Sequence, residues 1–236
     1  MKNEVEAKLR TAEDPTTAPE ILMKLSEDDD MEVRYVVTDN PNTPIEALVK
    51  LSRDEVGDVR QAVADNKKTP TDVLAKLSRD DDRDVRRSVA HNQNTPAEAL
   101  VRLSRDEVIA TRAGVAGNSN TPIEILEMLS KDEYGVVREC VARNANTPID
   151  VLLALSEDNE SDVRWGVAGN SNTPIEILEM LSKDESSRVR SKVAQNHNTP
   201  GEIRSELSKD EDWYVRTAAE STDAFISILK EQAKAE

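Results

Sequence analysis

Apolar residues recur along the chain in a short, regular pattern that is clearest between residues 42 and 66. Leu48 and Leu51 are three positions apart, and Val59 and Val63 are four apart, with small alanines beside the second pair. Spacings of three and four residues place side chains on one face of an α-helix, whereas a half-buried strand alternates at every second position. The pattern therefore predicts two short helices in this segment, and no part of the chain shows a strand pattern.

The same segment returns every 26 residues along the chain. Three positions, which hold arginine, aspartate and proline, keep this interval without exception. The arginine column is Arg34, Arg60, Arg86, Arg112, Arg138, Arg164, Arg190 and Arg216; the aspartate column is Asp28, Asp54, Asp80, Asp106, Asp132, Asp158, Asp184 and Asp210; the proline column is Pro44, Pro70, Pro96, Pro122, Pro148, Pro174 and Pro200. A fixed period of this length is typical of a solenoid, in which each unit buries its apolar face against its neighbours. We therefore predict an all-α solenoid of eight two-helix repeats.

Capping residues predict where each helix begins and ends. Thr43, followed by Pro44 and Glu46, is typical of a helix start with threonine as N-cap and proline in the first turn. This first helix is expected to end near residue 52, where the segment Ser52-Arg53-Asp54-Glu55 gives a second start signal with serine or aspartate as the cap. Asn66 is expected to end the second helix in the left-handed conformation, which asparagine tolerates.

The repeat decays at both ends of the chain, which suggests three segments. Residues 1–24 are predicted to form an N-terminal cap with a first short helix, in which Lys8 falls in the arginine column. Residues 25–206 contain seven regular repeats. Residues 207–236 are predicted to form a degenerate eighth repeat and a C-terminal cap helix over 223–234. Atypical ends suit a solenoid because the outer face of each terminal unit meets water.

Charge narrows the class of partner. The chain has 47 acidic and 31 basic residues, for a net charge of −16. Such a surface repels phosphate backbones, so nucleic acid is not expected as a partner, and a protein or peptide partner is expected to be cationic. The same charge favours a soluble monomer. Aromatic residues make up only 3% of the chain, so leucine, valine and alanine must supply most of the core.

Cysteine and apolar runs bear on the compartment. Cys140 is the only cysteine, so an internal disulfide is impossible and a reducing compartment fits. Its position in the other repeats holds small residues and, once, a lysine, so it is interpreted as a packing residue. No leader-like apolar run begins the sequence, and no stretch approaches 18 apolar residues. A cytoplasmic protein without a membrane span is expected.

The string Val-Ala-x-Asn-x-Asn-Thr-Pro-x-Glu-x-Leu-x-x-Leu-Ser-x-Asp-x-x-x-x-Val-Arg resembles the leucine-rich repeat variant family. It is nearly complete in residues 115–138 and 167–190, and the likeness covers almost the whole chain. The resemblance implies a right-handed superhelix in which α-helices alternate with shorter helices of either the α or the 3₁₀ type. The last part of the string is also similar to HEAT repeats. Some members of the family carry a cysteine-rich iron–sulfur segment, but a single cysteine cannot supply it, so no cofactor is expected.

Constant columns are interpreted as structural. An active site occurs once in a chain, whereas the aspartate and arginine columns recur eight times. Asp54 and Arg60 are therefore expected to join neighbouring repeats in a ladder of charge-assisted hydrogen bonds. The asparagines at positions 66, 92, 118, 144, 170 and 196 are expected to satisfy loop backbone.

The columns that change lie together on the outward face of the second helix when it is drawn as a wheel. They include residues of the types that serve as interface anchors. The candidate protein-binding face consists of Tyr35, Arg87, Glu139, Arg143, Trp165, Trp213 and Tyr214. Neutral drift at exposed positions would also produce variation, so both interpretations remain open at this point.

The sequence favours a non-enzymatic scaffold that presents this face for protein binding. Two alternatives remain. The first is a structural or consensus-designed array without a partner, because residues 115–133 and 167–185 are identical. The second, more remote, is a HEAT-like DNA glycosylase that would use Trp165, Trp213 and Asp162, although the charge of −16 opposes DNA binding. No metal site is expected, because the two histidines are four repeats apart and the aspartate runs lack the glycine and glutamate of a calcium loop.

Overall fold

The computed structural model describes residues 2–232, and within them every regular element is an α-helix. The chain divides into two compact units, Met1–Pro122 and Ile123–Glu236, which are considered separately. Among the described residues, no helix combines the length and the apolar character that crossing a membrane requires. The prediction of an all-α repeat fold is confirmed.

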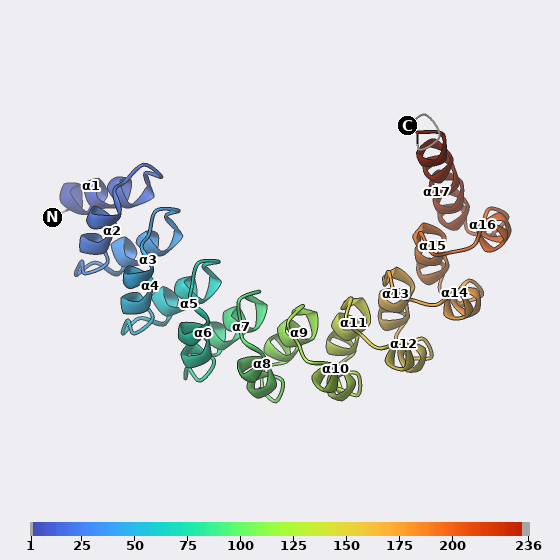
Figure 1. Ribbon diagram of the computed structural model, residues 1–236, viewed down its shortest axis with the longest axis horizontal. Coiled ribbons are helices and arrows are strands. Elements are labelled where there is room, and N and C mark those ends of the chain that lie inside the picture. The colour runs from blue at the N-terminus through green and yellow to red at the C-terminus, as the bar shows by residue number, and fades with distance from the viewer. Residues whose placement is uncertain (1, 233–236) are drawn as a thin grey trace. The chain divides into compact units, whose positions relative to one another are not determined.

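Each unit alternates seven-residue helices with longer ones (Figure 1), which have nine residues except in α1, with 12, and α17, with 20. The first unit contains α1 (Lys2–Glu13), α2 (Pro19–Leu25), α3 (Met31–Asp39), α4 (Ile45–Leu51), α5 (Gly57–Asp65), α6 (Thr71–Leu77), α7 (Arg83–His91), α8 (Ala97–Leu103) and α9 (Ile109–Gly117). The second contains α10 (Ile123–Leu129), α11 (Gly135–Arg143), α12 (Ile149–Leu155), α13 (Ser161–Gly169), α14 (Ile175–Leu181), α15 (Ser187–Gln195), α16 (Gly201–Leu207) and α17 (Trp213–Gln232). The shorter helices are α-helices, not the 3₁₀ helices that the resemblance allowed.

The helices of each unit form two rows. In the first unit, one row is formed by helices that each pack against the next, namely α1, α3, α5, α7 and α9. The seven-residue helices form a second row beside it (Figure 1). In the second unit α11, α13, α15 and α17 pack in the same way. We call these odd-numbered helices the long-helix row and the even-numbered helices the short-helix row. Within each unit, this stacking of one repeat on the next is the solenoid arrangement that the period predicts.

The core lies between the two rows. Leu48, Leu51, Val59 and Val63 are buried almost completely, and the residues at the same positions of the other repeats are buried as well. Full burial of a leucine or valine side chain stabilises a fold by about 1.5–3 kcal/mol. Most repeats bury four such residues and so give a thin apolar layer, which Thr111 and Arg204 interrupt where they replace a valine and a leucine.

The threonine before each proline does not cap the short helix, so that prediction is wrong. The helix begins at Ile45, one residue later than the proline, and Pro44 is its N-cap without a side-chain bond. The threonine hydroxyl donates instead to a carbonyl in the last turn of the preceding long helix, as in Thr95 Oγ1 to Val89 O at 2.6 Å. The same carbonyl also accepts the N–H of the C-cap residue Asn92 at 3.2 Å, so the threonine ties the start of the short helix to the end of the long one.

The start of the long helix also differs from the prediction. Ser52 is the C-cap of the short helix, and the long helix begins only at Gly57. The carboxylate of Asp54 accepts the N–H of Val56 at 3.0 Å, which closes a turn ahead of the helix. The N-cap residue differs from repeat to repeat. In α3 it is Asp30, whose carboxylate accepts a helix N–H, whereas in α5 it is Val56, whose side chain has no acceptor.

Asn66 is not left-handed, so this expectation is wrong too. Its backbone is extended, with φ −70° and ψ 125°, and no described residue has a positive φ. The extended backbone lets the side chain reach the preceding repeat, where it donates to the carbonyl of Thr38. Bridging between repeats therefore decides the conformation of this residue.

The ends of the array depart from the regular repeat. Lys8, in the arginine column, pairs with Asp28 at 2.8 Å, so α1 continues the pattern of the repeats. At the other end, the expected break before residue 223 is missing, and α17 runs from Trp213 to Gln232 as one helix. Thr222 replaces the helix-ending asparagine, and its hydroxyl bonds to Ala218 O within the helix. Residues 233–236 of the predicted cap lie outside the described residues.

Candidate protein-binding surface

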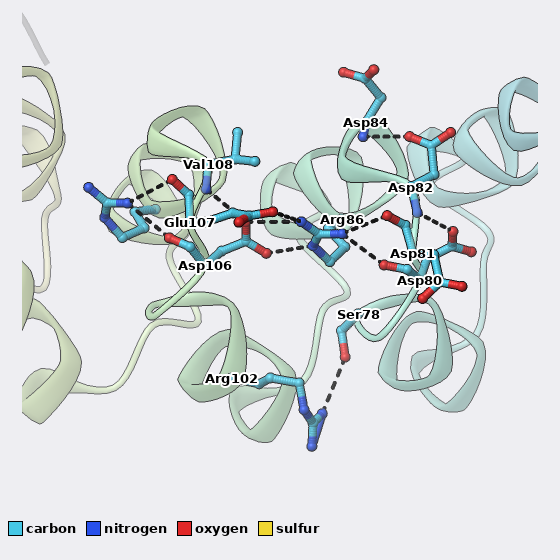
Figure 2. Close-up of polar contacts among 11 residues, drawn as sticks. Ser78, Asp80, Asp81, Asp82, Asp84, Arg86, Arg102, Asp106, Glu107 and Val108 are labelled. Atoms are coloured by element: carbon cyan, nitrogen blue, oxygen red, sulfur yellow. Dashed lines mark hydrogen bonds and ion pairs between the residues drawn. The ribbon is translucent and has the colours of Figure 1, made fainter.

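The arginine and aspartate columns form a ladder between neighbouring repeats, as predicted. Arg86 Nε donates to Asp106 Oδ2 at 2.6 Å, and its Nη1 donates to the carbonyls of Asp80 and Asp81 at 2.9 and 3.0 Å (Figure 2). Further pairs of the same kind are Arg34–Asp54, Arg60–Asp80, Arg138–Asp158, Arg164–Asp184 and Arg190–Asp210. Each guanidinium thus joins the loop of its own repeat to the carboxylate of the next one.

The ladder also fixes the charge of its members. Burial by itself raises the pKa of Asp54 and Asp80, but the arginine of the preceding repeat and a backbone N–H lower each pKa below its ordinary value. The hydrogen bonds that Arg34 and Arg60 donate to these aspartates raise the pKa of both arginines. Both partners therefore stay charged at neutral pH. A general acid or base must instead gain and lose a proton near the working pH, so the ladder pairs do not suit that role.

A second ladder is made by the asparagine column. Asn92 Nδ2 donates to the carbonyls of Ala64 and Asn66 at 2.7 and 3.1 Å, both in the preceding repeat. The oxygen of the same amide accepts the N–H of Asn94 at 2.8 Å. One side chain thus satisfies loop backbone in two repeats. We call the constant arginine, aspartate and asparagine columns, which bond one repeat to the next, the frame.

The predicted face lies on the long-helix row, where its members divide between the two units. In the first unit, Tyr35 is 41% exposed on α3, whereas Arg87 lies on α7 and pairs with Asp84 at 2.9 Å. The structure does not bring Tyr35 and Arg87 into one hollow. In the second unit, Glu139 and Arg143 pair with each other on α11 at 3.4 Å.

A groove of about 540 Å³ surrounds Tyr35 on α1, α3 and α5. We call it the acidic groove. Its lining residues are Leu9, Glu13, Met31, Glu32, Tyr35, Val36, Asp58, Gln61, Ala62 and Asp65. Four of them are carboxylates and none is basic. Sequence reasoning placed Tyr35 in a variable column, but it did not show that this residue meets Glu13 and Leu9 of the N-terminal cap.

A second groove, of about 500 Å³, lies on α13, α15 and α17. We call it the aromatic groove. It is lined by Trp165, Ser187, Arg188, Ser191, Lys192, Gln195, Asp212, Trp213 and Tyr214. The structure therefore brings together three of the predicted site residues. Trp213 and Tyr214 are 60% and 63% exposed, with ring centroids 4.4 Å apart.

Two cations hold the ring of Trp165. The guanidinium of Arg143 lies 5.6 Å from the ring centroid, and the ammonium of Lys192 lies 4.8 Å from it. Each such contact stabilises by about 0.5–1 kcal/mol at an exposed site. Sequence reasoning missed Lys192, although the signal was present, because this lysine stands in the column that holds Cys140 and other small residues. In that column the Cys140 thiol is half-buried, and burial raises its pKa.

Apolar residues on the short-helix row form a rival surface that sequence reasoning also missed. Ile45, Ile149 and Ile175 begin their helices and are each more than half exposed. Their column directly follows the prolines, and the other repeats hold proline, threonine, alanine, isoleucine or glycine there. Leu153 on α12 is equally exposed.

The residues that a glycosylase would use are engaged in other contacts. Asp162 pairs with Arg188 at 2.8 Å, and Trp165 is held by its two cations. Among the described residues, no three histidine, cysteine, aspartate or glutamate side chains are grouped so that they could hold a metal ion. The long-helix row thus carries two grooves, the acidic groove and the aromatic groove, on repeats that the two ladders bond together.

Known proteins share this arrangement. The family model described as leucine rich repeat variant matches residues 83–108. A solved structure described as a leucine-rich repeat variant with a novel repetitive structural motif is 30% identical, with a TM-score of 0.60 over 86% of this chain and 81% of that one. This chain belongs to the leucine-rich repeat variant family. The structure of YibA of Escherichia coli, 14% identical, with a TM-score of 0.53 over 93% of this leucine-rich repeat variant and 96% of that chain, shows a similar fold. A search of curated proteins gave no match.

Proposed function

We propose that this leucine-rich repeat variant protein is a non-enzymatic scaffold that binds a protein or peptide on its long-helix row. The observation that carries the proposal is the division of labour between columns. Constant arginines, aspartates and asparagines bond one repeat to the next, while the variable columns line two grooves. A surface held by a bonded frame loses little conformational entropy when it binds, which favours affinity.

The residue types in the grooves support the same function. Tyrosine, tryptophan and arginine are the residues that most often dominate binding energy at protein interfaces. Tyr35, Trp213 and Tyr214 expose large parts of their rings, although the core of this chain is almost free of aromatic residues. A structural array with no partner has no use for these rings at its surface. The scaffold acts as a monomer, which its net charge of −16 favours.

Capture of partners from a lysate of the source cells tests this function. The test compares the wild-type chain with a triple variant carrying Tyr35→Ala, Trp165→Ala and Trp213→Ala. A matched control carries Ile45→Ala, Ile149→Ala and Ile175→Ala on the short-helix row, where three large side chains are likewise removed. We expect the first variant to lose a partner that the control retains, with the helical circular dichroism of both unchanged. Equal capture by all three proteins, or loss only in the control, would contradict the proposal.

A further inference from the structure

We propose that the acidic groove binds a cationic peptide segment, with a lysine or arginine side chain lying against the ring of Tyr35. This inference rests on the proposed scaffold function and names the chemistry of one partner. It follows from three properties of the groove, namely its charge, the lack of internal partners for that charge, and the apolar surface beneath it.

The charge of the groove has a single sign. Glu13, Glu32, Asp58 and Asp65 line it, and all four side chains are exposed to solvent. They come from three successive helices of the long-helix row, so their potentials add over one hollow of about 540 Å³. This is the size of a small ligand site and accommodates one or two long side chains.

These carboxylates are not used by the frame. The ladder aspartates each have an arginine, and Asp28 has Lys8. Among the described side chains, none of the four groove carboxylates forms an ion pair with a lysine, arginine or histidine. The groove therefore presents negative charge that the chain itself does not neutralise. A cation from a partner supplies the missing charge.

The apolar part of the lining distinguishes a peptide side chain from a free metal ion. Tyr35 is 41% exposed, and Leu9, Met31 and Val36 lie in the same hollow. Lysine and arginine carry a charged head on an apolar stem, so the stem packs on such a surface while the head reaches the carboxylates. A tyrosine ring also attracts a cation placed over its face. In addition, no described group of side chains has the geometry of a metal site.

Isothermal titration of the full chain with a defined probe tests this inference. The probe is a capped nine-residue peptide in which two arginines flank a leucine among glycines and serines. A second peptide replaces both arginines with glutamate. We expect the arginine peptide to bind and the glutamate peptide not to bind. Amide chemical-shift changes in NMR spectra should concentrate on α1, α3 and α5.

Matched variants separate the groove from the net charge. Asp58→Asn with Asp65→Asn removes two charges from the groove, and Asp150→Asn with Glu176→Gln removes two exposed charges from the short-helix row. We expect the groove variant to weaken binding about tenfold, and the control to weaken it less than about twofold. A further variant, Glu13→Gln with Glu32→Gln, gives the same test should the first fail to fold. Tyr35→Ala should weaken binding on the order of fivefold.

The outcomes distinguish this inference from the scaffold function. Equal losses in the groove variants and the control would mean that the peptide responds only to net charge, which overturns the inference. Shifts centred on α13, α15 and α17 would overturn it as well. Absence of binding by the arginine peptide, with lysate capture still dependent on Tyr35, Trp165 and Trp213, would remove the inference and leave the scaffold function standing. If the arginine peptide does not bind and lysate capture does not depend on these three residues, both the inference and the scaffold function are contradicted.

Discussion

The acidic groove and the aromatic groove share a set of equivalent positions of the repeat, five periods apart in the sequence, yet the charges at these positions differ. Tyr35 corresponds to Trp165, Asp58 to Arg188, and Ala62 to Lys192. The frame beneath them is the same, since the equivalent ladder pairs Arg60–Asp80 and Arg190–Asp210 both have a length of 2.7 Å. The comparison teaches that the constant columns decide where a groove forms, and the variable columns decide what it can bind.

The two grooves also differ in how much of their chemistry is satisfied within the chain. In the aromatic groove, Arg188 pairs with Asp162, and Lys192 lies over Trp165. In the acidic groove, the carboxylates have no ion pair among the described side chains. The aromatic groove is therefore organised by its own cations, whereas the acidic groove requires a cation from outside.

Acid should have the largest effect, and it should act on both units in the same pH range. Asp54 and Asp80 in the first unit, and Asp158 and Asp210 in the second, have a pKa lowered below the ordinary value. A lowered folded-state pKa contributes stability that is complete above the unfolded pKa of about 3.9 and is lost as pH falls through the folded value. We expect helicity, followed by circular dichroism, to stay constant from pH 7 to about pH 4 and to fall cooperatively below it. Unfolding of one unit near pH 5 would contradict a shared frame.

Breaking one ladder pair in each unit should have equal cost. Arg60→Met and Arg164→Met each leave a mostly buried aspartate without its guanidinium. We expect each variant to lose about 3 kcal/mol in the free energy of unfolding, because an unpaired buried charge is strongly destabilising. Urea denaturation measures this loss. A difference of more than about 1 kcal/mol between the two variants would show that the frames are not equivalent.

Exchange of charge between equivalent positions should exchange binding. Asp58→Arg with Asp65→Gln gives the acidic groove the residues that the aromatic groove has at these positions. We expect affinity for the arginine peptide to fall about thirtyfold, which corresponds to about 2 kcal/mol. The reverse exchange, Arg188→Asp with Gln195→Asp, should create measurable binding of the same peptide on α13 and α15. Titration that detects neither change would mean that these columns do not determine what binds.

Removal of the central ring should destabilise one groove more than the other. Trp165→Ala loses two contacts with cations, and we expect it to cost about 1–2 kcal/mol in the free energy of unfolding. Tyr35→Ala removes an exposed ring with no cation over it and should stay within about 0.5 kcal/mol of the wild type. The measurement is again urea denaturation. Equal costs would show that Trp165 is not held by Arg143 and Lys192.

The period made the architecture and the arginine–aspartate ladder predictable, because charged residues that recur every 26 positions must meet the same partner in each repeat. The capping residues were harder to interpret. Threonine and asparagine commonly act locally at a helix end, but Thr95 and Asn66 instead bond to a neighbouring helix or repeat. Local sequence rules describe only the local role, and the structure shows the other one. The long α17 was missed for a related reason, since the loss of an asparagine removes a helix end without any positive signal.

The grooves could be predicted only in part. A helical wheel identifies which columns face outward, and this placed Tyr35, Trp165 and Trp213 correctly on the long-helix row. It does not show which residues of successive repeats share one hollow. The contribution of Glu13 depends on how α1 stacks against α3, and the position of Lys192 over Trp165 depends on side-chain conformation. Both are properties of packing between repeats, which the pattern of a single repeat does not contain.

A substitution library scored for both folding and partner capture would test the division between constant and variable columns most directly. Each position is changed to alanine, and each variant is scored separately for protease resistance and for binding of the arginine peptide or a captured partner. We expect changes in the arginine, aspartate and asparagine columns to lower protease resistance. Changes such as Asp58→Ala or Tyr35→Ala should lower binding while the protein stays resistant. The opposite result, with folded variants that lose binding lying in the constant columns or on the short-helix row, would contradict this division of labour.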